Sequence, residues 1–398
     1  MIEQDLLIRI ICMVLTTFVF VLFITPYIKK IAVHVGALDM PNARKIHKEP
    51  MPRLGGLGIF FGFLLGYMIF GTHSAIMNSI LISSFIVVLA GAVDDIKPLK
   101  ASVKFIAQLV AACIIVFYGN ILLKDISAFG IYIDFGILSI PLTIFFILGC
   151  INCMNLIDGM DGLAAGISSI YFLTIGIIAV IQSKFGLDFV LTFVMLGSTL
   201  GFLVHNFNPA SIFMGDSGSM FLGLIISVIA LLGFKNVTMT SIIIPLLLLA
   251  IPILDTLFAI LRRWLKGESL SKPDKFHIHH QLLKRNLSQR ATVICIYIIN
   301  LLFALASILY ILKDRTLGYI VYTILFIIVA LFVIKTNVVF ENEVVKKKIK
   351  DKIFKKKEDH VEKKEQQKNE KVKEVGEKTK EKKKTATSKN KKSNKKKK

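Results

Sequence analysis

Residues 242–254 read I-I-I-P-L-L-L-L-A-I-P-I-L, thirteen positions without a polar side chain. A helix formed by this stretch would be apolar on every face, which is typical of helices surrounded by lipid or by other apolar helices. A membrane-spanning strand would instead alternate polar and apolar residues. The stretch therefore predicts a transmembrane helix.

Similar apolar runs recur along the first 340 residues, separated by glycines, prolines and charges. Since a bilayer core takes about 20 residues of helix, we predict an all-α polytopic membrane protein with about 11 transmembrane helices. The first run opens with Glu3 and Asp5 rather than with basic residues, so we expect it to remain as a helix and not to be a signal peptide. The predicted spans are residues 6–28, 54–71, 75–93, 102–119, 140–157, 163–181, 189–206, 217–234, 241–262, 291–312 and 317–335.

The charges divide the chain into two parts. Its 398 residues carry 49 Lys and Arg against 27 Asp and Glu, a net charge of +22, although 54% of the residues are hydrophobic. Residues 341–398 hold 25 Lys against 11 acidic residues, which is typical of solvated, disordered chain. We therefore predict a transmembrane domain over residues 1–340 and a disordered, Lys-rich cytoplasmic tail over residues 341–398. This division excludes a soluble cytosolic enzyme and a basic globule that binds nucleic acid.

Basic residues in the short loops predict the orientation. With the N-terminus outside, the inner side carries 18 Lys and Arg and the outer side carries 6. Cytoplasmic loops are enriched in these residues, so we predict this orientation. An odd number of spans then places the C-terminal tail in the cytoplasm, where its lysines would be attracted to anionic lipid.

Five aspartates follow the predicted inner ends of spans, where charged groups are costly and are therefore candidates for function. Two of them belong to N-C-M-N-L-I-D-G-M-D-G, residues 152–162, in which polar residues recur every three positions and share a helix face. Another belongs to F-M-G-D-S-G-S, residues 213–219. Helix caps and loops are the simpler alternative for both motifs. The five are Asp94, Asp95, Asp158, Asp161 and Asp216.

Five neighbouring carboxylates would repel one another unless a cation lay among them. Mg²⁺ prefers such hard oxygen ligands together with substrate phosphates, so we predict a Mg²⁺ site that includes Asp216. Two inner loops add cationic groups that suit a diphosphate: residues 39–56 contain Arg44, Lys45, His47 and Arg53, and residues 272–280 contain His277, His279 and His280. Zinc binding by the histidines and an ordinary basic inner loop are the alternatives.

An acidic metal site beside cationic loops favours phosphoryl transfer between a soluble nucleotide donor and a lipid acceptor. A transporter or flippase for a phosphorylated lipid is the alternative from another class. Five motifs resemble those of the polyprenyl-phosphate N-acetylhexosamine-1-phosphate transferases of glycosyltransferase family 4. In order, they are V-D-D (93–95), N-x-x-N-x-x-D-G-x-D-G (152–162), F-M-G-D-S-G-S (213–219), P-I-L-D-T (252–256) and H-I-H-H (277–280).

The resemblance implies transfer of N-acetylglucosamine-1-phosphate from UDP-GlcNAc to undecaprenyl phosphate with release of UMP. This would be the first membrane step of a cell-wall glycan such as teichoic acid or O-antigen, at the cytoplasmic face of a bacterial cell membrane. The first loop and H-I-H-H are more similar to this branch than to the peptidoglycan branch, which transfers phospho-N-acetylmuramoyl-pentapeptide and is the closest alternative. The implied partners are the two substrates and the bilayer; a homodimer is left open and no nucleic acid is expected.

The resemblance also implies the roles of particular residues. Catalytic roles fall to Asp94, Asp95, Asp158 and Asp161, and Mg²⁺, with Mn²⁺ as a substitute, would be held by Asp216 and Asp158. The implied substrate contacts are Asn155, Phe213, Lys104, His277, His279, His280, Arg44, Lys45 and His47.

Overall fold

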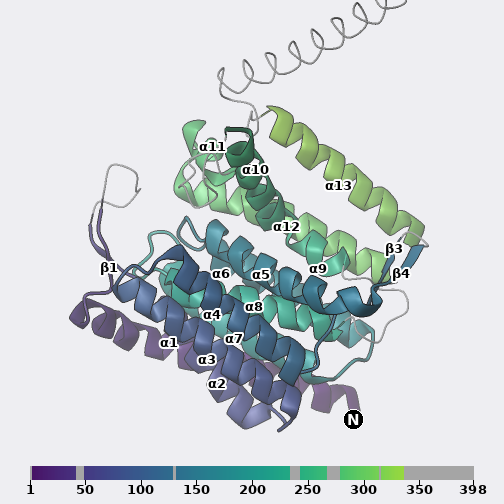
Figure 1. Cartoon of the computed structure of the whole chain (residues 1–398), viewed down its shortest axis with the longest axis horizontal. Coiled ribbons are helices and arrows are strands. Elements are labelled where there is room, and N and C mark those ends of the chain that lie inside the picture. The colour runs from purple at the N-terminus through teal and green to yellow at the C-terminus, as the bar shows by residue number, and fades with distance from the viewer. Residues whose placement is uncertain are drawn as a thin grey trace, which may run out of the picture. The chain divides into compact units, whose positions relative to one another are not determined.

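The computed structural model describes residues 2–41, 49–128, 131–233, 243–266, 278–312 and 315–335, and this part of the chain is largely helical (Figure 1). Its strands form two short antiparallel pairs, β1 (Leu38–Asp39) with β2 (Met51–Pro52) and β3 (Asp125–Ala128) with β4 (Ile131–Asp134). The helices are α1 (Ile2–His34), α2 (Gly55–Phe70), α3 (Ala75–Ile96), α4 (Ala101–Cys113), α5 (Ser139–Ile157), α6 (Leu163–Ile181), α7 (Leu187–Asn206), α8 (Gly215–Gly233), α9 (Ile243–Leu248), α10 (Ala250–Lys266), α11 (Ile278–Lys284), α12 (Gln289–Leu312) and α13 (Arg315–Lys335).

Eight helical segments within the described residues are long and apolar enough to cross a membrane. The prediction of a polytopic helical membrane protein is therefore confirmed, while the count of about 11 spans and the orientation stay predictions. The eight segments are Gln4–His34, Ala75–Ile96, Ala101–Tyr118, Gly136–Ile157, Leu163–Ile181, Leu187–Asn206, Gly215–Gly233 and Gln289–Leu312. Residues 341–398, the predicted tail, lie outside the described part of the chain.

Two predicted spans have a different form in the structure. The span at 54–71 corresponds to α2, which has only 16 residues. The span at 241–262 corresponds to two helices, since α9 ends at Leu248 and α10 begins at Ala250. Pro252 explains this interruption, because it lacks the amide hydrogen that would bond to the carbonyl oxygen of Leu248 in a continuous helix.

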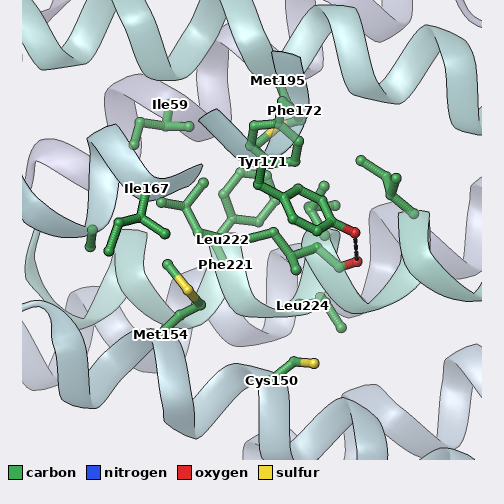
Figure 2. Packing of buried hydrophobic residues seen from close by; sticks show 14 of the residues in the cluster. Ile59, Cys150, Met154, Ile167, Tyr171, Phe172, Met195, Phe221, Leu222 and Leu224 are labelled. Atoms are coloured by element: carbon green, nitrogen blue, oxygen red, sulfur yellow. Dashed lines mark hydrogen bonds between the residues drawn. The ribbon is translucent and has the colours of Figure 1, made fainter. Parts of the chain in front are cut away.

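Helix α8 lies at the centre of the helix packing and contacts α2, α3, α5, α6 and α7. Nearly every residue between Gly215 and Leu231 is buried, as expected for a helix that is apolar on all sides. Figure 2 shows the core around Phe221, where the hydroxyl of Tyr171 donates to the carbonyl oxygen of Ile226 on α8 at 3.3 Å. Packing from several sides thus fixes the helix whose first turn carries one of the predicted site residues.

Glycines allow α2 to approach the segment that leads into α8. A Cβ on Gly56 would lie 2.0 Å from the amide nitrogen of Gly218, so the close contact requires glycine. The backbones also pair, because the amide of Gly55 donates to the carbonyl oxygen of Phe213 at 3.0 Å and that of Gly56 donates to Met214 at 2.8 Å. The start of α2 therefore fixes the position of residues 213–218.

Candidate functional site

Three of the five predicted acids come together where α3 ends and α8 begins. One carboxylate oxygen from each of Asp94, Asp95 and Asp216 lies within 4.8 Å of the other two. Asp94 and Asp95 are buried in the last turns of α3, and Asp216 is partly exposed in the first turn of α8. Oxygen ligands at this separation can share one hard metal ion, so the cluster is consistent with a metal site.

Asp95 is bound to the first turn of α8 through both of its oxygens. Oδ1 accepts from the amide of Asp216 at 2.9 Å, and Oδ2 accepts from the amide of Ser217 at 3.1 Å and from its hydroxyl at 2.8 Å. The Asp95 side chain is 0% exposed, and Nη2 of Arg53 lies 3.2 Å from Oδ1. The first amides of a helix have no partner within it, and the helix dipole favours a negative charge there. Asp95 thus stabilises the turn that positions Asp216.

Two cations lie against the acidic cluster. Nζ of Lys104, on α4, is 2.8 Å from Oδ2 of Asp216 and 3.3 Å from Oδ1 of Asp94. Nη2 of Arg53 is 3.6 Å from Oδ1 of Asp216. Burial lowers the pKa of Arg53, but attraction to Asp95, Asp216 and other acids outweighs it, so the Arg53 pKa is raised. The three carboxylates keep one negative charge in excess of these two cations, which fits the binding of a further cation.

Arg53 belongs to the first inner loop, whose cationic groups were predicted to suit a diphosphate, but its contacts with Asp95 and Asp216 were not predicted. The available signal was its position, immediately before the L-G-G that begins α2. Because α2 is packed against the start of α8, a residue at this point is brought to the acidic cluster.

Asp161 is bound to the segment that follows α7. Its Oδ2 accepts from Nδ2 of Asn208 at 2.8 Å and from the amide of Ala210 at 3.1 Å. The next residue, Gly162, donates its amide hydrogen to Oδ1 of Asn206 at 3.0 Å. The sequence did not predict Asn206 or Asn208 as part of the site. Helices α6 and α7 separate these asparagines in the chain from the loop that carries Asp161.

Asp158 differs from Asp161. It directly follows α5, and its carboxylate has no hydrogen-bond partner among the residues that the structure describes. Burial raises its pKa from 3.8 to about 8, and repulsion from Asp216 and Asp95 adds to this shift. The carboxylates that lie close enough to share one metal ion are those of Asp94, Asp95 and Asp216. The pairing of Asp158 with Asp216 as metal ligands therefore stays a prediction.

Asn155 lies on the side of α5 that faces α8. Its Nδ2 donates to Oγ of Ser219 at 2.9 Å, and its side chain also interacts with the carboxylate of Asp216. One turn earlier, Nδ2 of Asn152 donates to Oε1 of Gln108 on α4 at 2.9 Å. The spacing of three therefore predicted a real polar face, which brings Asn155 to the acidic cluster.

The remaining predicted contacts are described only in part. Phe213 is partly exposed just before α8, and its amide donates to the carbonyl oxygen of Pro52 at 2.8 Å. His279 and His280 lie in α11, but their side chains are outside the description. The predicted residues that lie outside the described part of the chain are Arg44, Lys45, His47 and His277.

The fold and site define a multi-pass helical membrane protein with a buried aspartate cluster flanked by cations. Residues 77–234 match the model of glycosyl transferase family 4. The chain is 43% identical over 336 residues to a probable undecaprenyl-phosphate N-acetylglucosaminyl 1-phosphate transferase of Bacillus subtilis, covering 83% of this chain and 92% of the relative. It is 33% identical to a decaprenyl-phosphate N-acetylglucosaminephosphotransferase of Mycolicibacterium smegmatis, covering 71% and 78% of the two chains.

A third relative is the undecaprenyl-phosphate alpha-N-acetylglucosaminyl 1-phosphate transferase of Escherichia coli K12, at 28% identity over 74% of this chain and 82% of the relative. The chain belongs to glycosyl transferase family 4. The resemblance inferred from the five motifs is thereby confirmed.

Proposed function

We propose that this protein transfers N-acetylglucosamine-1-phosphate from UDP-GlcNAc to undecaprenyl phosphate and releases UMP. An oxygen of the lipid phosphate attacks the phosphorus that bears the sugar, and the bond from that phosphorus to the bridging oxygen breaks, so that UMP leaves. The observation that carries the proposal is the cluster of Asp94, Asp95 and Asp216 with Lys104 and Arg53 against it. The names of the relatives support the same sugar and a polyprenyl acceptor.

The acids take different roles in this proposal. Asp216 and Asp158, with the amide oxygen of Asn155 nearby, would hold Mg²⁺ or its substitute Mn²⁺, since all three offer the hard oxygens that these ions prefer. When bound, Mg²⁺ supplies positive charge that lowers the repulsion between the two anionic substrates. Asp161 supports the loop that presents Asp158.

Asp94 orients the lipid phosphate rather than deprotonating it. A phosphate monoester with a second pKa of about 6 is already mostly ionised at pH 7, so a general base is not required. Lys104 contacts both Asp94 and Asp216, and from there it can contact phosphate oxygens of either substrate. Asp95 positions the first turn of α8.

The outer parts of the site contact the nucleotide sugar. Phe213 stacks on the uracil, as its partly exposed position before α8 allows. The diphosphate and the sugar are bound by the histidines of residues 277–280 and by Arg44, Lys45 and His47. The site opens to the cytoplasmic face of a bacterial cell membrane, with the N-terminus outside, and a homodimer stays an open prediction.

The test uses the full-length protein in detergent with UDP-GlcNAc, undecaprenyl phosphate and Mg²⁺. We expect UMP release that requires the lipid, and a lipid product whose mass corresponds to added N-acetylhexosamine and one phosphate. A panel of UDP-sugars that includes UDP-N-acetylmuramoyl-pentapeptide identifies the donor. Preference for the pentapeptide would replace this proposal with the peptidoglycan reaction. No UMP from any donor, together with lipid movement in vesicles, would favour a flippase.

A further inference from the structure

Helix α12 contacts the loop that carries Asp158 and Asp161, although it contains none of the motifs considered above. The hydroxyl of Tyr297 donates to the carbonyl oxygen of Gly162 at 2.5 Å. Gly162 has a φ of +79° and its amide is already bonded to Asn206. Both polar groups of this glycine are therefore held by side chains from other helices.

Tyr297 reaches the loop because its ring packs against a glycine of α6, Gly166. A Cβ on Gly166 would lie 1.9 Å from the hydroxyl oxygen of Tyr297, so any larger residue would displace the ring. Gly166 also lies one turn after Gly162, and its amide donates to the carbonyl of Gly162 at 2.8 Å. The start of α6 is thus shaped to receive a side chain from α12.

A second contact from the same helix reaches Asp161 by another route. Nε of Arg290 donates to the carbonyl oxygen of Asn208 at 2.7 Å. Asn208 in turn donates through Nδ2 to Oδ2 of Asp161 at 2.8 Å. Helix α12 therefore holds Asp161 from two directions, through the next residue in the chain and through the partner of its carboxylate.

We infer that Tyr297 and Arg290 are positioning residues that hold residues 158–162 in the geometry needed for transfer. This inference rests on the proposed function, because that function assigns Asp158 and Asp161 to the reaction. Helix α11, which contains His279 and His280, directly precedes α12 and contacts it. The same helix therefore links the histidine segment with the acidic loop.

The first test replaces Tyr297 by Phe, which removes one hydroxyl group and keeps the ring. Tyr322→Phe is the matched control, because Tyr322 on α13 also donates a buried hydrogen bond, to Oγ of Ser307 at 2.8 Å. We expect Y297F to lower kcat about tenfold and to leave KM for UDP-GlcNAc within about twofold of the original value. The half-saturating Mg²⁺ concentration should rise, and Y322F should change none of these three quantities.

Arg290→Gln provides a second variant that keeps the fold, since the hydrogen bond of Arg290 is exposed. It should lower kcat about threefold, in the same direction as Y297F. Equal losses of kcat and Tm in Y297F and Y322F would overturn the inference, because the effect would then be general destabilisation. Unchanged kinetics in both Y297F and R290Q would overturn it as well.

Amide hydrogen exchange gives a measurement that does not depend on activity. The peptide that contains residues 158–166 should exchange faster in Y297F than in the original protein, and its rate in Y322F should not change. Unchanged exchange in Y297F would overturn the inference. An original protein that releases no UMP would instead overturn the proposed function, and the exchange comparison would still decide the role of Tyr297.

Discussion

The two aspartate pairs of this protein are built on the same plan. In the first pair, Asp95 ties α3 to the backbone of α8, whereas Asp94 accepts from the nearby amide of Leu99 and lies 3.3 Å from Nζ of Lys104. In the second pair, Asp161 ties its loop to the segment after α7, whereas Asp158 makes no hydrogen bond within the described residues. Each pair therefore has one acid that bonds to a distant segment of the chain and one to which the proposed function assigns a ligand.

The pairs differ in how their charge is balanced. Asp94 and Asp95 share the cations Lys104 and Arg53 with Asp216. For Asp158, the attraction of Arg53 is outweighed by burial and by repulsion from Asp216 and Asp95, and its pKa is raised to about 8. The ionised carboxylates of the first pair are thus stabilised by cations of the protein itself. The ionised form of Asp158 would be stabilised more by an added cation.

Asp95→Asn should have the largest effect, because it removes a buried charge that is paired with Arg53 and bonded to the start of α8. Breaking a buried, hydrogen-bonded ion pair costs about 3 kcal/mol of unfolding free energy. We expect Tm to fall and transfer to be lost together, measured by thermal unfolding in detergent and by UMP release. A variant with full Tm and full activity would contradict the structural role of Asp95.

Asp94→Asn should lower activity without lowering stability, which separates it from its neighbour. We expect kcat/KM to fall about 100-fold or more, as for loss of an electrostatic contact in a transition state. Tm should match that of Asp125→Asn, a control at an exposed position in β3. Unchanged turnover between about pH 6 and 9, where the lipid phosphate is mostly ionised, would exclude any role for Asp94 in the reaction.

Asp158 should make stability depend on pH. An acid whose pKa is raised on folding binds its proton more tightly in the folded state, so stability falls as pH rises from 3.8 towards about 8. Without a divalent cation, Tm should therefore decrease between about pH 4 and about pH 8. Asp158→Asn should make this decrease in Tm smaller. Added Mg²⁺ should reduce the decrease in the original protein but not in the variant. Identical pH profiles for the two proteins would contradict this account.

Asp161→Asn should have the smallest effect of the series. An asparagine oxygen can still accept from Asn208 and Ala210. The charge-assisted hydrogen bonds become neutral ones, which lowers the free energy of unfolding by about 1 kcal/mol. We expect a small fall in Tm and a fall of several-fold in kcat, less than for Asp158→Asn. A larger loss of activity in Asp161→Asn than in Asp158→Asn would reverse the roles assigned to the second pair.

The sequence predicted a polytopic helical membrane protein because each spanning helix must be apolar over a length set by the bilayer, and eight such helices lie within the described residues. It did not predict the break between α9 and α10, since a hydropathy pattern is unaffected by the missing amide of Pro252. It also identified the motif aspartates and the common face of Asn152 and Asn155. It did not separate Asp94 from Asp95, which are adjacent in the chain and identical in chemistry.

The sequence by itself determined that this is a polytopic helical membrane protein of glycosyl transferase family 4, because long apolar runs and ordered polar motifs are local properties. Only the tertiary structure decided which acid of each pair bonds to a distant segment of the chain. That division depends on partners such as Ser217 for Asp95 and Asn208 for Asp161, 122 and 47 positions away in the chain. Contacts over such distances follow from helix packing, and so do the places of Arg53 and Tyr297 beside the site.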